Sequence, residues 1–380
     1  MNTHSSADFA HKTAPSIGVL LSNLGTPDSP KTSDVRKYLK EFLWDHRVVE
    51  VPRPIWWFIL NAVILNTRPR KSAKAYKKVW TKNGSPLMSI SMDQLRGIKA
   101  QFNSGDDSVD FSGEHFEDSS GKMPSIHFEF SMRYGNPSIE SGLSALRDKG
   151  VNRILILPLY PQYSATTTAS TFDEVTRVIS KWRRIPELRF INHYHDDENY
   201  INALAARINI HWQEHGKAEH LLMSFHGIPQ DYFDSGDPYH CECHKTARLL
   251  AEKLGLSDDR WTLSFQSRLG PKQWLKPYTD ETLKAMPSKG IKNIQVVCPG
   301  FSADCLETIE EIAMENRDIF IESGGEVYEY IPCLNDSAEH LFALESLIRK
   351  HVQGWEDRAI SQQQINMTKQ RAKSLMQPWT

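Results

Sequence analysis

Short apolar runs rich in β-branched residues recur along the chain, and most of them are separated by segments with helical spacing of apolar residues. The runs are IGVLLSNL from residue 17, IHFEFSMR from 126, NRILILP from 152, LRFINHY from 188, HLLMSFH from 220, WTLSFQS from 261, NIQVVCP from 293 and EVYEYIP from 326. Each run has the length of a strand and is apolar on both faces. Alternation of such strands with helices predicts an α/β fold in which helices cover parallel sheets.

Two parts of this pattern occur twice. LLSNLGTP from residue 20 resembles LMSFHGIP from 222, and KGVNRILILP from 149 resembles KGIKNIQVVCP from 289. Two matches in the same order indicate an internal duplication. We therefore expect two Rossmann-like domains, each with a four-stranded parallel sheet flanked by helices. They are residues 16–185, with a C-terminal helix at 335–354 packing back on them, and residues 186–334.

Ligands of open α/β sheets bind beyond the carboxyl ends of the strands, so we expect the site in a cleft between the two domains. Residues 30–100 add several helices after the first strand and are expected to form a lip on this cleft. Residues 103–124 are acidic and rich in Gly and Ser, which predicts an exposed excursion. The polar tail after Trp355 is expected to be peripheral.

The lip contains the most apolar stretch of the sequence, IWWFILNAVIL at residues 55–65. It is too short to span a bilayer, which takes about 20 apolar residues. Trp56 and Trp57 lie in it, and cationic residues flank it: Arg53, Arg68, Arg70 and Lys71. This combination is typical of a segment that lies on a membrane surface. A buried core helix explains the composition equally well.

Composition narrows the class of protein. The formal net charge is −2 with acidic and basic residues interspersed, which argues against nucleic acid as a partner. The first sixteen residues lack the apolar region of a signal peptide, and the five cysteines are too few and too uneven for a disulfide framework. We expect a cytoplasmic protein, with contact at the inner face of the membrane if residues 55–65 lie on it.

Candidate chemistry gathers at the strand ends of the second half. His226 ends an apolar strand, whereas its counterpart in the first half is Leu24. Glu307, Glu311 and Glu315 recur every four residues, so a helix places them on one face, where they can pass on protons or hold a cation weakly. Two alternatives stay open: His226 as a structural histidine, and Asp304 with Glu307 as a capping box.

A second cluster is Cys241-Glu-Cys243-His244, preceded by His240. Its cysteines are closer together than those of usual zinc sites, and no second pair follows. A loop that precedes a helix fits this segment better than a structural metal site. The glycine-rich motifs of nucleotide-binding loops are absent from the sequence, so no nucleotide cofactor is expected.

Five motifs together resemble the ferrochelatase family, in that family's order, from about residue 17 to about residue 352. They are LLSNLGTPDSP, LYPQYSATTT, SFHGIP, FQSRLGPKQWLKPYTDETL and GFSADCLETIEE. The resemblance implies a lyase of haem biosynthesis that inserts Fe(II) into protoporphyrin IX. It also implies that two pyrrole protons are lost and that no cofactor is bound permanently.

The resemblance also assigns residues. It implies that His226 is catalytic, that Glu307 and Glu311 form an acidic path, and that His226 and Glu307 contact the metal. Pocket positions that match are Leu24, Arg133, Tyr134, Tyr160, Trp274 and Phe301. Positions near the propionates that match are Arg68, Ser85 and Ser267.

Three departures from the family pattern change what we expect. Cys305 stands where many relatives have a histidine. The last cysteine is Cys333, so no C-terminal iron–sulfur cluster is expected. Leu24 replaces the tyrosine of coproporphyrin-using relatives, which favours protoporphyrin as the substrate.

Two other functions remain open, and so does the oligomeric state. The chain could metallate another tetrapyrrole or use another metal, such as coproporphyrin III or cobalt, although the Trp-rich lip argues against a highly charged ring. It could also bind porphyrin or haem without catalysis.

Overall fold

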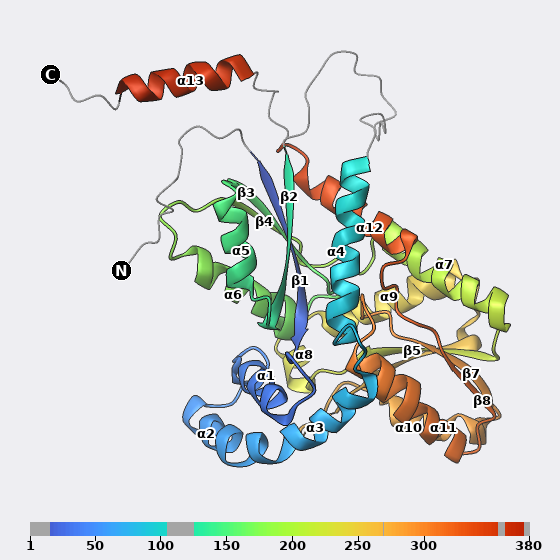
Figure 1. The fold of residues 1–380 in the computed structure, drawn as a ribbon. Helices are drawn as coiled ribbons and strands as arrows, with labels where there is room; N and C mark the ends of the chain where they lie inside the picture. Colours follow the sequence, from blue (N-terminus) through green and yellow to red (C-terminus); the bar gives the residue numbers. More distant parts are fainter. Residues whose placement is uncertain (1–15, 105–124, 269, 356–361, 376–380) are drawn as a thin grey trace.

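The computed structural model describes residues 16–104, 125–268, 270–355 and 362–375, and it contains two parallel sheets of four strands (Figure 1). The first has the order β2-β1-β3-β4, with β1 (Ile17–Thr26), β2 (Ile126–Gly135), β3 (Arg153–Pro158) and β4 (Glu187–Phe190). The second has the order β6-β5-β7-β8, with β5 (His220–His226), β6 (Trp261–Gln266), β7 (Asn293–Val297) and β8 (Val327–Tyr330). The eight predicted strands are thus confirmed. The strands have the same order in both sheets, which agrees with a duplication.

Strand β4 pairs in parallel with β3, so the first sheet extends to Phe190. The expected domain boundary at 185/186 therefore comes too early, because it separates β4 from its own sheet. Helix α12 (Ala338–Val352) packs against α4 (Pro86–Ser104) and β3 of the first domain and also against α7 (Glu198–His215). Arg153 Nη1 donates to the carbonyl oxygen of Trp355 at 2.6 Å, which fastens the end of this helix to the first sheet.

Helices α4, α7 (Glu198–His215), α9 (Tyr239–Lys253) and α12 contribute to one core shared by both sheets. The outer face of the first sheet packs against α5 (Ile139–Asp148) and α6 (Ser170–Ile179). Helices α10 (Thr279–Ala285), η5 (Glu307–Asn316) and α11 (Arg317–Glu322) cover the outer face of the second. In β1, Val19 and Leu21 face the shared core and Leu20 the outer one, which is why the strands are apolar on both faces.

The lip expected at residues 30–100 is shorter, because α4 belongs to the shared core. It consists of α1 (Thr32–Trp44), α2 (Arg53–Phe58), η1 (Ile59–Ile64) and α3 (Leu65–Val79), which have an apolar cluster of their own. Helix α3 also contacts η5 of the second domain, and Lys78 Nζ lies 2.7 Å from Glu310 Oε1. The lip therefore bridges the two domains. In the described residues, no helix combines the length and the apolar character that crossing a membrane requires.

The remaining elements are short or terminal. They are η2 (Ala165–Ala169), α8 (Gln230–Asp234), η3 (Asp258–Arg260), η4 (Pro287–Lys289) and α13 (Gln362–Leu375). Most of the acidic excursion expected at 103–124 lies outside the described residues, because 105–124 are not among them. The tail after Trp355 is described only for α13.

Gly25 is the buried penultimate residue of β1 and lies at a close approach to β2. Its φ is +131°, and an added Cβ would lie 2.0 Å from the carbonyl oxygen of Tyr134. We expect Gly25→Ala to lower the free energy of unfolding by more than about 4 kcal/mol, because the obstacle is backbone. Urea-induced unfolding followed by circular dichroism measures this change.

Gly84→Ala is the matched control. Gly84 has a φ of +95° and nothing within 4 Å of the added Cβ. Gly84→Ala should lower the free energy of unfolding by only about 1–3 kcal/mol, which is the cost of an unfavourable backbone conformation. Equal losses in both variants would show that the approach to Tyr134 does not determine the cost.

Candidate active site

His226 is the last residue of β5 and is half-buried. Its Nδ1 lies 2.6 Å from the carbonyl oxygen of Gly227. Because a carbonyl oxygen only accepts hydrogen bonds, Nδ1 carries the proton of this bond. In the neutral ring, Nε2 therefore has the free lone pair, which is the atom that can accept a proton or bind a metal.

Gln266, the register partner of His226 on β6, links the sheet to η5. Its Nε2 donates to the carbonyl oxygen of Glu307 at 3.0 Å and lies 3.5 Å from Glu311 Oε2. Ser224 Oγ donates to its Oε1 at 2.8 Å, which fixes the amide orientation. Gln266 was not among the residues expected from the sequence. Its position could have indicated it, because it is a polar residue that ends a buried strand beside the strand of His226.

The carboxylate row lies on η5, which is a π-helix with i→i+5 hydrogen bonds rather than the expected α-helix. Glu307 and Glu311 are half-buried, whereas Glu315 is exposed. The capping-box alternative is wrong. The carboxylate of Asp304 instead accepts hydrogen bonds from Thr308 at 3.0 Å, Tyr330 at 2.5 Å and Asn335 at 2.8 Å.

Glu311 has the clearest electrostatic perturbation in this group. Burial raises its pKa to about 7, and repulsion by Glu307 and Glu315 acts in the same direction. The Ser267 hydroxyl donates to Oε2 of Glu311 and opposes part of this rise. Ser267 itself has a φ of +67°, an uncommon conformation for a residue other than glycine. A carboxyl group with a pKa near 7 can take up and release a proton at neutral pH.

Two aromatic side chains flank His226. Trp274 forms an isolated antiparallel bridge with Pro229, and an added Cβ on Gly227 would lie 3.2 Å from its ring. The ring centroid of Phe301 lies 6.5 Å from that of His226. The structure thus gathers six of the expected site residues at one edge of the second sheet: His226, Ser267, Trp274, Phe301, Glu307 and Glu311.

Leu24 and the edge of the second sheet both contact the lip. It packs against the apolar cluster of the lip, as does Leu306 from the start of η5. Tyr76 of that cluster has a pKa raised by burial and next by the charge of Glu307. Leu24 from the first domain and Glu307 from the second thus border the same lip helices.

Arg133 and Tyr134 belong to a separate polar cluster around Asp45. Arg133 Nη2 donates to Asp45 Oδ2 at 2.6 Å, and the hydroxyls of Tyr134 and Ser170 donate to the same oxygen at 2.8 and 2.6 Å. Burial acts to raise the pKa of Asp45, but these hydrogen bonds outweigh it and the pKa is lowered. The side chain of Tyr134 is fully buried, and Asp45 and Ser170 are partners that the sequence analysis did not identify.

The other expected residues take three further positions. Thr26 Oγ1, at the end of β1, donates to Ser85 Oγ at 2.8 Å, and both residues are buried. Arg68 is half-buried on α3, and burial lowers its pKa. Tyr160 follows β3, and burial raises its pKa.

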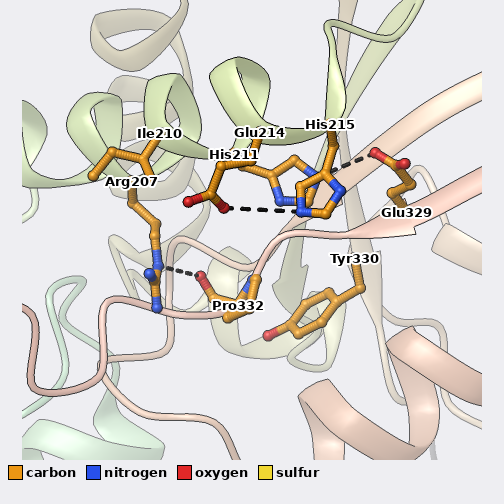
Figure 2. Close-up of a pocket in the computed structure, with 8 residues that line it drawn as sticks. All are labelled: Arg207, Ile210, His211, Glu214, His215, Glu329, Tyr330 and Pro332. Carbon is orange, nitrogen blue, oxygen red and sulfur yellow. Dashed lines mark hydrogen bonds and ion pairs between the residues drawn. The ribbon is translucent and has the colours of Figure 1, made fainter.

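A pocket of about 430 Å³ lies between α7 and β8 (Figure 2). β8 is two strands from β5, which corresponds to about 10 Å of sheet width. Figure 2 shows mostly charged or titratable walls: Arg207, Ile210, His211, Glu214, His215, Glu329, Tyr330 and Pro332. Such walls do not match an apolar macrocycle, so this pocket is not the active-site candidate.

The Cys241–His244 segment is the beginning of α9, not the expected loop. Cys243 is buried, and His240 packs on Phe265 with ring centroids 5.7 Å apart. Glu242 instead meets His193 and His195 of the first domain. The side chains of the segment therefore do not converge on one metal.

Comparisons with known proteins identify the fold and the family. The SirB protein from Bacillus subtilis, solved with Fe3+, has a similar fold with a TM-score of 0.53 over 90% of this chain and 99% of that chain; at 14% identity, this likeness supports the fold alone. The ferrochelatase of Marinobacter nauticus is 55% identical over 92% of this chain and 90% of its own length. That of Thioalkalivibrio sulfidiphilus is 53% identical over the same shares. The family model for ferrochelatase matches residues 16–352, and the chain belongs to the ferrochelatase family.

Proposed function

We propose that this chain inserts Fe(II) into protoporphyrin IX and that His226, Glu307 and Glu311 perform the chemistry. The observation that carries the proposal is the link through Gln266. This residue is the register partner of His226 in the sheet, and its side chain hydrogen-bonds to the backbone carbonyl of Glu307 and to the carboxylate of Glu311. The base at the end of β5 is thus one strand away from a side chain that holds η5, on which Glu307 and a carboxyl group with a pKa near 7 lie.

The apolar groups around His226 supply binding energy. A flat porphyrin directs its nitrogen lone pairs into the ring plane, so bending the ring exposes them to an approaching metal. Burial of several hundred Å² against Leu24, Trp274 and Phe301, at about 25 cal/mol per Å², contributes several kcal/mol toward this distortion. Binding far from the nitrogens then strains the reacting centre.

Proton transfer starts at Nε2 of His226, which accepts a pyrrole proton. Glu311 then takes the proton and releases it to solvent, because its pKa is near the working pH. Two such transfers balance the entry of one Fe(II) ion. Glu307, with Nε2 of His226 before that nitrogen takes up a proton, holds the incoming iron weakly, as a site that must release its ion into the ring requires. The proposal includes no resident cofactor and no iron–sulfur cluster.

The test supplies Fe(II) or Zn(II) anaerobically to the protein with protoporphyrin IX and follows the Soret and visible absorption bands. We expect conversion to the metalloporphyrin, and slower conversion of coproporphyrin III. Binding of porphyrin without metallation would favour a carrier and overturn the proposal. Faster conversion of coproporphyrin III would overturn the substrate assignment based on Leu24.

We also propose that the lip contacts an anionic membrane surface at the inner face of the cytoplasmic membrane. Trp57 and Phe58 of α2 are 57% and 64% exposed, and Ile55 and Val63 are exposed with them. Lys71 follows on α3. Trp56 differs from Trp57: it is buried, and its Nε1 donates to the carbonyl oxygen of Leu43. Trp56 and Leu60 thus pack inward, whereas the exposed side chains of the same stretch are the ones that we propose for contact with the membrane.

The double variant Trp57→Ser and Phe58→Ser should weaken binding to phosphatidylglycerol vesicles by at least about 100-fold. Burying one large apolar side chain contributes about 1.5–3 kcal/mol, and each 1.4 kcal/mol is about tenfold in affinity. Co-sedimentation with vesicles measures the change. The control, Phe172→Ser with Ile185→Ser, removes two apolar side chains exposed elsewhere and should bind as the wild type does. Equal binding by both double variants would contradict a role of the lip.

A further inference from the structure

Two histidines and a glutamate meet where the first domain contacts the second, apart from the group around His226. His193 and His195 follow β4, and Glu242 lies in the first turn of α9. We propose that these three side chains bind a divalent transition-metal ion that ties the β4–α7 connection to α9.

The ligand atoms have suitable separations. All three lie within 4.8 Å of one another. Nδ1 of His193 lies 2.6 Å from Glu242 Oε1, and Nδ1 of His195 lies 3.2 Å from Oε2. A metal about 2.1 Å from each ligand requires ligand atoms no more than about 4.2 Å apart. The present arrangement therefore needs only small side-chain rotations, which the exposed ring of His193 can make.

The state of His195 is an independent indication of a missing ligand. Its side chain is 7% exposed, and its Nδ1 has no hydrogen bond of regular geometry although the Glu242 carboxylate is close. Buried imidazole nitrogens are normally satisfied by a donor, an acceptor or a metal. A metal between Nδ1 and Glu242 satisfies this nitrogen.

Surrounding groups hydrogen-bond to the ligand residues and hold them in place, as is usual at metal sites. The backbone N–H of Tyr163 donates to Glu242 Oε2 at 2.7 Å, and Thr246 Oγ1 donates to the carbonyl oxygen of His195 at 2.8 Å. The second ring nitrogen of His195 faces the Asp196 carboxylate at 3.9 Å. Asp196 in turn pairs with Lys245.

The donor set determines the class of metal. Two imidazole nitrogens and one carboxylate suit Zn(II), Fe(II) or Co(II), whereas Mg(II) and Ca(II) prefer oxygen ligands alone. Glu242 is 7% exposed, but the His193 side chain is 51% exposed, so the ion is reached from solvent on that side. Three protein ligands leave one coordination position for water.

The test uses Co(II) alone as the probe and the full chain with His226→Ala, which removes the imidazole expected to contact iron. Equilibrium dialysis and the visible absorption of Co(II) measure binding. We expect this parent chain to bind one Co(II). Adding His193→Ala should weaken that binding by more than about tenfold, because even changes around a ligand cost about 10–100-fold.

His215→Ala on the same background is the matched control, because the side chain of His215 is also 51% exposed and lies near a carboxylate. It should bind Co(II) as the parent does. Co(II) should also raise the midpoint of thermal unfolding of the parent but not of the His193→Ala chain. Equal affinity with and without His193, or no binding by the parent, would overturn the proposal. Neither result depends on whether the chain metallates porphyrin.

Discussion

His226→Ala is expected to lower kcat for metal insertion by about 10²–10⁴-fold, the usual contribution of a general base. The variant removes the only ring nitrogen in this group that has a free lone pair, because Nδ1 is engaged with the carbonyl oxygen of Gly227. Porphyrin affinity should change little, since Trp274, Phe301 and Leu24 remain. Initial rates of Zn(II) insertion and fluorescence titration with protoporphyrin IX separate the two effects.

His226→Asn distinguishes a chemical role from a positional one. The asparagine amide can donate the hydrogen bond that Nδ1 makes to Gly227, but it offers no basic nitrogen. We expect this variant to be as inactive as His226→Ala. An active His226→Asn chain would show that the histidine only holds the end of β5 in place, and it would remove Nε2 from the mechanism.

Sequence periodicity was sufficient for the strands because each of them is buried on both faces. Val19 and Leu20 pack into different cores, so neither face of β1 requires polar residues and the run is unmistakable. The duplication then predicted two sheets of four parallel strands each. It predicted the domain boundary less well, because the short strand β4 adds little apolar length between polar segments.

Contacts between distant segments were not accessible in this way. The neighbouring residues Trp56 and Trp57 have equal hydropathy, and only the packing of α2 on α1 decides that the first is buried. Glu242 was grouped with its neighbours Cys241 and Cys243, although its partners His193 and His195 lie almost 50 positions earlier. Asp45 likewise gains its importance from Arg133 and not from its neighbours in sequence.

The site residues that the sequence could indicate were those at strand ends. His226 and Gln266 end neighbouring strands, so the topology of the sheet brings them together without any knowledge of loops. The spacing placed Glu311 on a helix face, but it could not show how deeply that face is buried. Its burial comes from the way η5 packs on the second sheet, and this burial is the main cause of its raised pKa.

That raised pKa has a consequence for stability. The pKa of Glu311 is about 7 in the folded chain and about 4.5 in a solvated glutamate. Between these values the folded state binds more protons than the unfolded state, so the free energy of unfolding falls as the pH rises from about 4.5 to about 7. A difference of about 2.5 pKa units corresponds to about 3 kcal/mol, which is the full effect above pH 8.

Glu311→Gln should therefore be more stable than the wild type at pH 8, by about 1–3 kcal/mol, and equally stable at pH 4.5, where the wild-type side chain is protonated. The amide can accept the hydrogen bond from Ser267 as the acid does, so packing is kept. Urea-induced unfolding at the two pH values measures the difference. Glu315→Gln, on the exposed part of the same helix, is the control and should change stability by less than about 0.5 kcal/mol at either pH.

The same Glu311→Gln variant should insert metal at least about 100-fold more slowly, because glutamine cannot relay the protons that leave the porphyrin. A variant that is more stable but slower than the wild type indicates that the charge of Glu311 serves the reaction although it destabilises the fold. Variants that gain stability at pH 8 but keep the wild-type rate would place the proton path elsewhere. No gain at pH 8 would mean that Glu311 is ionised at little cost, and its pKa could not then be near 7.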